Sequence, residues 1–110
     1  MFSRELKKGS TALLILSLLE TGPRHGYEIG KMIERRSQGK LRLQIPSLYP
    51  MLCRLESRGL IRGRWLEKDG ERRRRYYRLT ADGRRMLLEE RPNWREFIAA
   101  VNRVVGRGHA

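Results

Sequence analysis

Apolar positions along the chain fall into segments that glycine and proline separate. Residues 9–20 are apolar on nearly every side, which is typical of a central helix, although a buried strand is an alternative. Thr-Gly-Pro at 21–23 ends this segment. Residues 25–37 predict an amphipathic helix with His25 near its N-terminal cap. Its apolar side is predicted to consist of Tyr27, Ile29, Met32 and Ile33.

The next segments predict a short strand and then a third helix. Residues 41–45 alternate apolar and polar positions, as a strand would. The helix is predicted to begin at Ser47, whose hydroxyl can accept a free backbone N–H group. Pro50 then falls in the first turn, where its missing N–H is tolerated. Gly59 fits the position just after the helix end. One apolar face should point inward, with Leu48, Leu52 and Leu55.

A β-hairpin is predicted to follow the third helix. Residues 62–67 and 72–79 form two extended runs, and the Asp-Gly pair at 69–70 favours a type I′ turn between them. With two loop residues, Trp65 and Tyr76 share one face of the hairpin. The hairpin is therefore the candidate wing of a helical domain.

A last helical stretch is predicted over residues 80–105. Pro92 should kink or split it, and Asn93 with Glu96 resembles a capping box that would restart a helix. The second half carries a broad apolar stripe, made of Trp94, Phe97, Ile98, Val101, Val104 and Val105. Taken together, the segments predict a mainly α (α+β) fold: a winged helix-turn-helix with a two-stranded wing and a C-terminal helix.

The charge of the chain narrows the class of partner. Lys and Arg number 25 against 12 Asp and Glu, which gives a formal net charge of +13. Such an excess favours a polyanion as the partner, with nucleic acid before an anionic membrane surface.

The longest apolar run, residues 12–16, is far too short to span a bilayer, and no signal peptide is evident. Cys53 cannot form an intramolecular disulfide, and a buried thiol is favoured over a redox switch. We therefore expect a cytoplasmic, nucleoid-associated protein without a membrane partner.

The predicted fold places two sets of residues against DNA. In helix-turn-helix proteins the later helix lies in the major groove and its N-terminal residues reach the bases. The candidates there are Gln44, Ser47, Tyr49, Pro50 and Arg54. The candidates on the wing are Lys68, Arg72, Arg73, Arg74 and Arg75. Arginine is favoured in a minor groove.

Each of these assignments has a structural alternative. Tyr49 could pack against the wing, and Arg54 could pair with a carboxylate. The wing arginines could form a solvated sheet edge that guards against aggregation. Two histidines and one cysteine far apart in sequence give no metal-ligand spacing. Neither a phosphate-binding loop nor a nucleophile–base motif is present, so we expect no enzyme, no catalytic residue and no cofactor.

Four ordered motifs resemble those of PadR-like transcriptional regulators. They are HGYEI at 25–29, SLYP at 47–50 continued by RLE at 54–56 and GLI at 59–61, RYYRLT at 75–80 with Gly83, and WREF at 94–97. Four motifs in the family's order, spread over residues 6–105, are far more specific than one short pattern. Two features depart from the family pattern: Pro92 interrupts the last helix, and residues 45–47 replace a common Gly-Thr start.

The resemblance implies a DNA-binding domain over residues 1–79 and a C-terminal dimerisation helix over 80–110. It implies a homodimeric repressor on an inverted-repeat duplex, in many members released by a small molecule. Some members hold a planar aromatic compound between paired tryptophans at the position that Trp94 matches. The implied dimer and effector residues are Trp94, Phe97, Ile98, Val101 and Val105. For Trp94 and the stripe after it, interface packing is favoured over a dedicated ligand site.

Two other functions remain open from the sequence. A basic winged helix could bind structured RNA, although RNA recognition usually relies on aromatic residues that stack on exposed bases. The domain could also act as a protein-interaction module that never reads DNA. The arginine-rich wing argues against the second of these.

Overall fold

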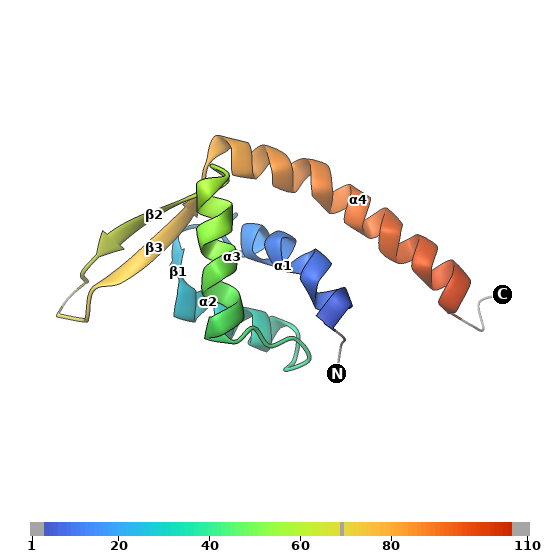
Figure 1. Ribbon diagram of the computed structural model, residues 1–110, viewed down its shortest axis with the longest axis horizontal. Coiled ribbons are helices and arrows are strands. Elements are labelled where there is room, and N and C mark those ends of the chain that lie inside the picture. The colour runs from blue at the N-terminus through green and yellow to red at the C-terminus, as the bar shows by residue number, and fades with distance from the viewer. Residues whose placement is uncertain (1–3, 69, 107–110) are drawn as a thin grey trace.

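The computed structural model describes residues 4–68 and 70–106, with only the backbone described for residues 4–9. Three helices pack together, the hairpin projects to one side, and the far half of the last helix projects to the other (Figure 1). The elements are α1 Arg4–Leu18, β1 Arg24–His25, α2 Gly26–Arg36, α3 Ile45–Ser57, β2 Ile61–Leu66, β3 Arg74–Leu79 and α4 Ala81–Val105. This arrangement confirms the predicted winged-helix fold.

The segment that is apolar on nearly every side forms the central helix α1, so the alternative of a buried strand is wrong. Ile15, Leu16 and Leu19 are buried because α2, α3 and α4 all pack against α1. Arg24 fixes the C-terminal end of the helix, since its Nε donates to the Leu18 carbonyl oxygen at 2.8 Å.

Helix α2 is capped as the sequence predicts, but one of its apolar residues is misplaced. The Nδ1 atom of His25 accepts the backbone N–H of Glu28 at 3.2 Å, which satisfies a free donor in the first turn. Ile29, Met32 and Ile33 are buried. Tyr27 remains 54% exposed, so its prediction as a core residue is wrong. It lies roughly 200° around the helix from Ile29 and therefore on the outer side.

Helix α3 begins at Ile45, two residues before the predicted start at Ser47. Pro46 explains the difference, because its fixed φ and missing N–H suit the first turn of a helix. Pro50 consequently lies inside the helix. The strand predicted over residues 41–45 is absent, since residues 41–44 adopt no regular structure and the Leu41 N–H donates to the Ser37 hydroxyl instead. The predicted inward face is confirmed, with Leu48, Leu52 and Leu55 all buried.

The end of α3 follows the sequence signal closely. Gly59 adopts a φ of +77°, which a residue with a side chain rarely accepts. Its N–H donates to the Glu56 carbonyl oxygen at 2.9 Å, and the Leu60 N–H donates to that of Leu55 at 3.0 Å. These two bonds form a Schellman motif, and Leu60 and Ile61 are buried just beyond it.

The sheet has the order β1-β3-β2, so a third short strand joins the predicted two-stranded wing. The register pairs Leu66 with Arg74 and Trp65 with Arg75. An odd number of residues, 67–73, therefore separates the strands, whereas a two-residue loop was predicted. A shift by one residue exchanges the faces of a strand, so Trp65 shares a face with Tyr77, and the prediction that it shares a face with Tyr76 is wrong.

The turn at the tip of the wing is only partly described. The Glu71 N–H donates to the Lys68 carbonyl oxygen at 2.7 Å, and Gly70 has a φ of +75°. Asp69 lies outside the described residues, so the predicted type I′ geometry stays a prediction.

Helix α4 runs from Ala81 to Val105 without interruption, and the predicted split at Pro92 is wrong. In Figure 1 its ribbon curves along its length without a break. Pro92 lies at an exposed position, where solvent can hydrogen-bond the carbonyl that its missing N–H leaves free and the helix can bend instead of ending. Thr80 caps the helix by accepting the Gly83 N–H at 3.0 Å, and its hydroxyl donates to the Gly59 carbonyl oxygen.

A lateral ion pair ties α4 to the end of α1. Arg91 Nη2 lies 2.7 Å from Glu20 Oε1, and hydrogen bonds from Arg91 lower the pKa of the Glu20 carboxyl group.

Within the described part of the chain, even the 25-residue α4 is too polar to cross a membrane.

Candidate nucleic-acid interface

The outer face of α3 is the first half of the candidate interface. The buried leucines fix which side faces solvent, and four of the predicted contact residues lie on that side: Gln44, Ser47, Pro50 and Arg54 are exposed. No ion pair involves Arg54 within the described residues, so the alternative that it only pairs with a carboxylate finds no support. Its guanidinium is available to an external anion.

Tyr49 packs against α2 and not against the wing, which is the structural alternative that the sequence offers. A β-carbon on Gly26 would lie 2.7 Å from the Tyr49 hydroxyl oxygen, so the glycine makes room for this ring. Tyr49 is nevertheless 39% exposed. The ring therefore sits between α2 and solvent beside the first turns of α3.

Cys53 is exposed, and the prediction of a buried thiol is wrong. Position 53 follows the fully buried Leu52 by one residue, which rotates it about 100° away from the inward face. The outer face of α3 thus carries the Cys53 thiol beside Arg54, which forms no ion pair within the described residues.

The wing is the second half of the candidate interface, and its four consecutive arginines divide into two pairs. Arg72 and Arg73 are exposed and form no ion pair within the described residues. The Arg73 guanidinium lies 5.3 Å from the centre of the Trp65 ring. Lys68 Nζ, at the wing tip, lies 4.6 Å from the centre of the Tyr76 ring. Lys68 and Arg73 thus lie over aromatic rings, and all three cations are exposed.

Arg74 and Arg75 are instead tied to the body of the domain. Arg74 Nη1 lies 3.4 Å from His25 Nδ1, on the strand next to it. Arg75 Nη2 forms a 2.7 Å ion pair with the Glu56 carboxylate of α3. The sequence predicted all four arginines as DNA contacts, and the structure gives two of them partners within the chain.

A further group of cations, not predicted from the sequence as DNA contacts, lies on the outer face of the hairpin. Arg62 lies directly opposite Arg78, and Arg64 follows two positions along the same face. Like charges that face each other across a sheet repel, and within the described residues no carboxylate pairs with these three. The signal was present as alternating arginines at 62 and 64, but it required the correct register to read.

Known proteins share both the sequence pattern and this geometry. The model of the transcriptional regulator PadR-like family matches residues 15–89. The chain belongs to this family. A transcriptional regulator from Clostridium thermocellum is 30% identical over 96% of this chain and 99% of its own, with a TM-score of 0.86. A PadR family regulator from Eggerthella lenta is 32% identical over 94% and 88%, with a TM-score of 0.78. Protein X of Lysinibacillus sphaericus is 29% identical over 87% and 88%.

In this PadR-like regulator the apolar stripe of α4 is largely exposed. Phe97 is 55% exposed, Val104 and Val105 more so, and Ile98 and Val101 somewhat less. Trp94 is half-buried and its ring centre lies 5.8 Å from that of Phe97. The stripe thus continues past the body of the domain, where the described residues leave it uncovered.

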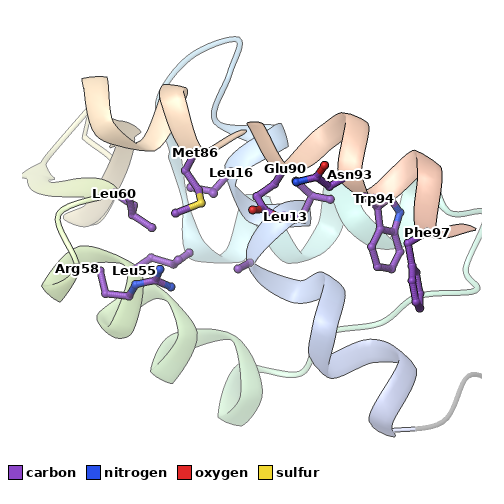
Figure 2. A pocket seen from close by; sticks show the side chains of 11 residues that line it. Leu13, Leu16, Leu55, Arg58, Leu60, Met86, Glu90, Asn93, Trp94 and Phe97 are labelled. Carbon is purple, nitrogen blue, oxygen red and sulfur yellow. The ribbon is translucent and has the colours of Figure 1, made fainter. Parts of the chain in front are cut away.

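A cavity of about 670 Å³ opens between α1, the end of α3 and α4. Figure 2 shows Trp94 and Phe97 side by side at one end of it and Leu60 with Arg58 at the other. The wall between them is mostly apolar, with Leu13, Leu16, Leu55 and Met86, and Glu90 and Asn93 add polar groups. Within the described residues, no cluster of side chains suits a metal ion.

The fold lowers the pKa of His25, which lies at the start of α2. Burial, and then the positive charges of Arg74 and Lys68, lower its pKa from the ordinary value of 6.5, while the Glu28 and Glu71 carboxylates act in the opposite direction. Its Nδ1 atom accepts the Glu28 N–H, so the neutral ring carries its proton on Nε2. Protonation of Nδ1 would remove the cap of α2.

We expect this regulator to lose stability as the pH falls below 6.5 because of His25. The unfolded chain binds the proton at 6.5 and the folded chain only at a lower pH, so the contribution is complete above 6.5 and disappears through the lowered folded pKa. Urea unfolding of the wild type and of His25→Asn from pH 7.5 to 5 measures this. Asparagine caps without titrating, so the variant should show a shallower pH dependence. Equal slopes would contradict the assignment.

Proposed function

We propose that this PadR-like regulator is a homodimeric repressor that binds an inverted-repeat duplex in a sequence-specific manner. Each protomer inserts α3 into the major groove and lays its wing along the neighbouring groove. The observation that carries this proposal is the juxtaposition of the solvent-facing side of α3 with unpaired wing cations on one domain. Residues 1–79 form the DNA-binding part and residues 80–110 the dimerisation part.

The exposed side of α3 offers the chemistry that reads base edges. Gln44 and Ser47 can donate and accept hydrogen bonds, and Arg54 carries a guanidinium that can pair with guanine or a phosphate. Leu48, Leu52 and Leu55 hold the helix at a fixed angle to the domain. Arg72, Arg73 and Lys68 supply phosphate contacts, which position the protein on the duplex.

The exposed stripe of α4 supports dimerisation. A stripe that includes Phe97, Ile98 and Val101 is larger than the isolated apolar residues that a monomer normally exposes. A second copy of the same helix would cover it, and two-fold symmetry would present two α3 helices to two half-sites. The dimer would then block the promoter to polymerase by occupying it.

The cavity beside Trp94 supports release by a small molecule. Its volume suits a drug-sized ligand, and an aromatic compound could stack on Trp94 or Phe97. A ligand held between α1 and α4 would change the distance between the two α3 helices of the dimer. The two helices would then no longer match half-sites about one helical turn apart, and the operator would be released.

Selection of bound duplexes from a random library tests this function directly. We expect the selected sequences to share an inverted repeat with half-sites about one helical turn apart. Binding to the selected duplex should exceed binding to random duplex after titration with salt. Enrichment of an asymmetric site would reject the dimeric model. Equal binding to random duplex, or tighter binding to structured RNA, would reject the specific DNA-binding function.

The wing cations should account for part of the salt dependence. In the variant with both Arg72→Gln and Arg73→Gln, we expect the slope of log K against log salt concentration to fall by about two. The preference among base sequences should change little, because phosphate contacts carry no sequence information directly. The double change Arg84→Gln and Arg85→Gln, on exposed positions of α4, is the control for net charge alone. An equal decrease of the salt-dependence slope in both variants would show that the wing does not contact the DNA.

A further inference from the structure

Arg75 occupies a junction between α3 and both strands of the wing. Its Nη2 atom lies 2.7 Å from Glu56 Oε2, and the same carboxylate oxygen accepts the Gly63 N–H at 2.9 Å. The guanidinium lies 5.8 Å from the ring centres of both Trp65 and Tyr77. One carboxylate of α3 thus binds the backbone of β2 and the side chain of β3 at the same time.

Gly63 is fitted to this junction. A β-carbon at position 63 would lie between 2.5 and 2.8 Å from three atoms of the Arg75 guanidinium. Any side chain on β2 at this point would push Arg75 away from Glu56. Gly63 therefore supports the ion pair of Glu56 and Arg75 in two ways. Its lack of a side chain leaves room for the guanidinium, and its backbone N–H binds the same carboxylate.

The junction is also where the wing needs support. Strand β2 is an edge strand of the sheet, and an edge strand presents backbone groups without a neighbouring strand. Glu56 satisfies one of them. The pair of Glu56 and Arg75 is 30% exposed on each side, so it is less screened than a pair in open water. In Figure 1 the hairpin extends away from α3 toward its tip.

We propose that Glu56, Gly63 and Arg75 form a lock that fixes the direction of the wing relative to α3. In this role Arg75 is a positioning residue and does not contact DNA, while Arg72 and Arg73 carry the phosphate contacts. The lock makes the spacing between the helix in the major groove and the wing a fixed property of the free protein. This inference rests on the proposed function, since it assigns a purpose to the angle between the two DNA-contacting elements.

Replacing Glu56 distinguishes the lock from simple electrostatics, because the two predict opposite changes in DNA affinity. Removing a carboxylate raises the net positive charge, so electrostatics alone predicts tighter DNA binding for Glu56→Ala. The lock predicts binding about tenfold weaker, because the wing no longer meets the groove at the correct angle. Glu67→Ala removes an exposed wing carboxylate that forms no ion pair within the described residues, and it should bind equally or more tightly. Unchanged or tighter binding by Glu56→Ala would overturn the lock.

A double-mutant cycle decides the role of Arg75. If Arg75 acts through Glu56, adding Arg75→Ala to Glu56→Ala should change the affinity by less than about twofold. If Arg75 contacts a phosphate directly, the two losses should multiply, and the lock fails. Glu56→Gln keeps an acceptor oxygen for Gly63 and should recover part of the binding. Binding by Glu56→Gln tighter than wild type would also reject the lock.

Footprinting and amide exchange keep the test independent of overall stability. Hydroxyl-radical protection beneath the wing should disappear in Glu56→Ala while protection beside α3 remains, whereas uniform loss would indicate a folding defect and reject the inference. In the free protein the Gly63 amide should exchange at least about tenfold faster in Glu56→Ala, with amides that bond across the hairpin as the reference. An unchanged exchange rate of the Gly63 amide in Glu56→Ala would contradict the lock even if DNA binding is confirmed. Failure of the wild type to select any duplex would reject the proposed function and leave the exchange result standing.

Discussion

Replacing Gly83 with alanine is expected to lower the free energy of unfolding by roughly 3 kcal/mol or more. Gly83 lies in the first turn of α4 and is buried against the segment that follows α3. A β-carbon at this position would overlap the carbonyl oxygen of Leu60 and press on the Leu79 side chain. The Leu60 carbonyl is backbone and accepts the Thr80 N–H at 3.2 Å, so it cannot move away without breaking that bond.

Ordinary helix propensity acts in the opposite direction, which makes the test decisive. Alanine inside a helix is favoured over glycine by about 1 kcal/mol, so a site without crowding would gain stability from the change. Urea unfolding followed by circular dichroism measures the difference. Arg84→Ala, at the exposed next position of the same helix, should change stability by less than about 0.5 kcal/mol. A Gly83→Ala variant as stable as the wild type would show that α4 does not pack this closely on Leu60.

If the proposed dimer forms through α4, replacing Phe97 with aspartate is expected to separate it and to weaken binding to the selected duplex roughly 100-fold. Phe97 lies more than half exposed in the middle of the α4 stripe, beside Trp94. A carboxylate there would be buried without a partner if a second α4 covered the stripe, and that cost falls on the dimer rather than on the folded monomer. Specific binding would fall because two linked half-site contacts would become two separate events.

Ala99→Asp is the matched control for this experiment. It places the same charge on the same helix, two residues away and on a different side of α4, at an exposed position. Sedimentation equilibrium should show a monomer for Phe97→Asp and a dimer for Ala99→Asp, and circular dichroism should show that both variants remain folded. A dimer that survives Phe97→Asp would place the interface elsewhere on the chain.

Local chemistry made several elements predictable from the sequence. The spacing of Leu48, Leu52 and Leu55 fixed the inward face of α3, because only one side of a helix can carry that periodicity. Gly59 marked the helix end, since its backbone conformation excludes most side chains. His25 and Thr80 were placed correctly at the starts of α2 and α4, where side-chain acceptors satisfy free N–H groups. The charge excess pointed to a polyanion before any geometry was known.

The sequence alone determined the order of the helices and the hairpin, the buried side of α3 and the basic character of the wing, because these depend on neighbours within a few residues. Only the tertiary structure decided the register of β2 on β3, the third strand β1, the exposure of Cys53 and Tyr27, and the uninterrupted course of α4. Those features depend on contacts between segments far apart in the chain. A one-residue shift in register decides whether Trp65 lies on the same face of the hairpin as Tyr77 or as Tyr76. The pairing of Glu56 with Arg75, 19 residues apart in the chain, has no local signature in the sequence. That is why four consecutive arginines look alike in the sequence, while in the folded chain two are held by partners and two face solvent.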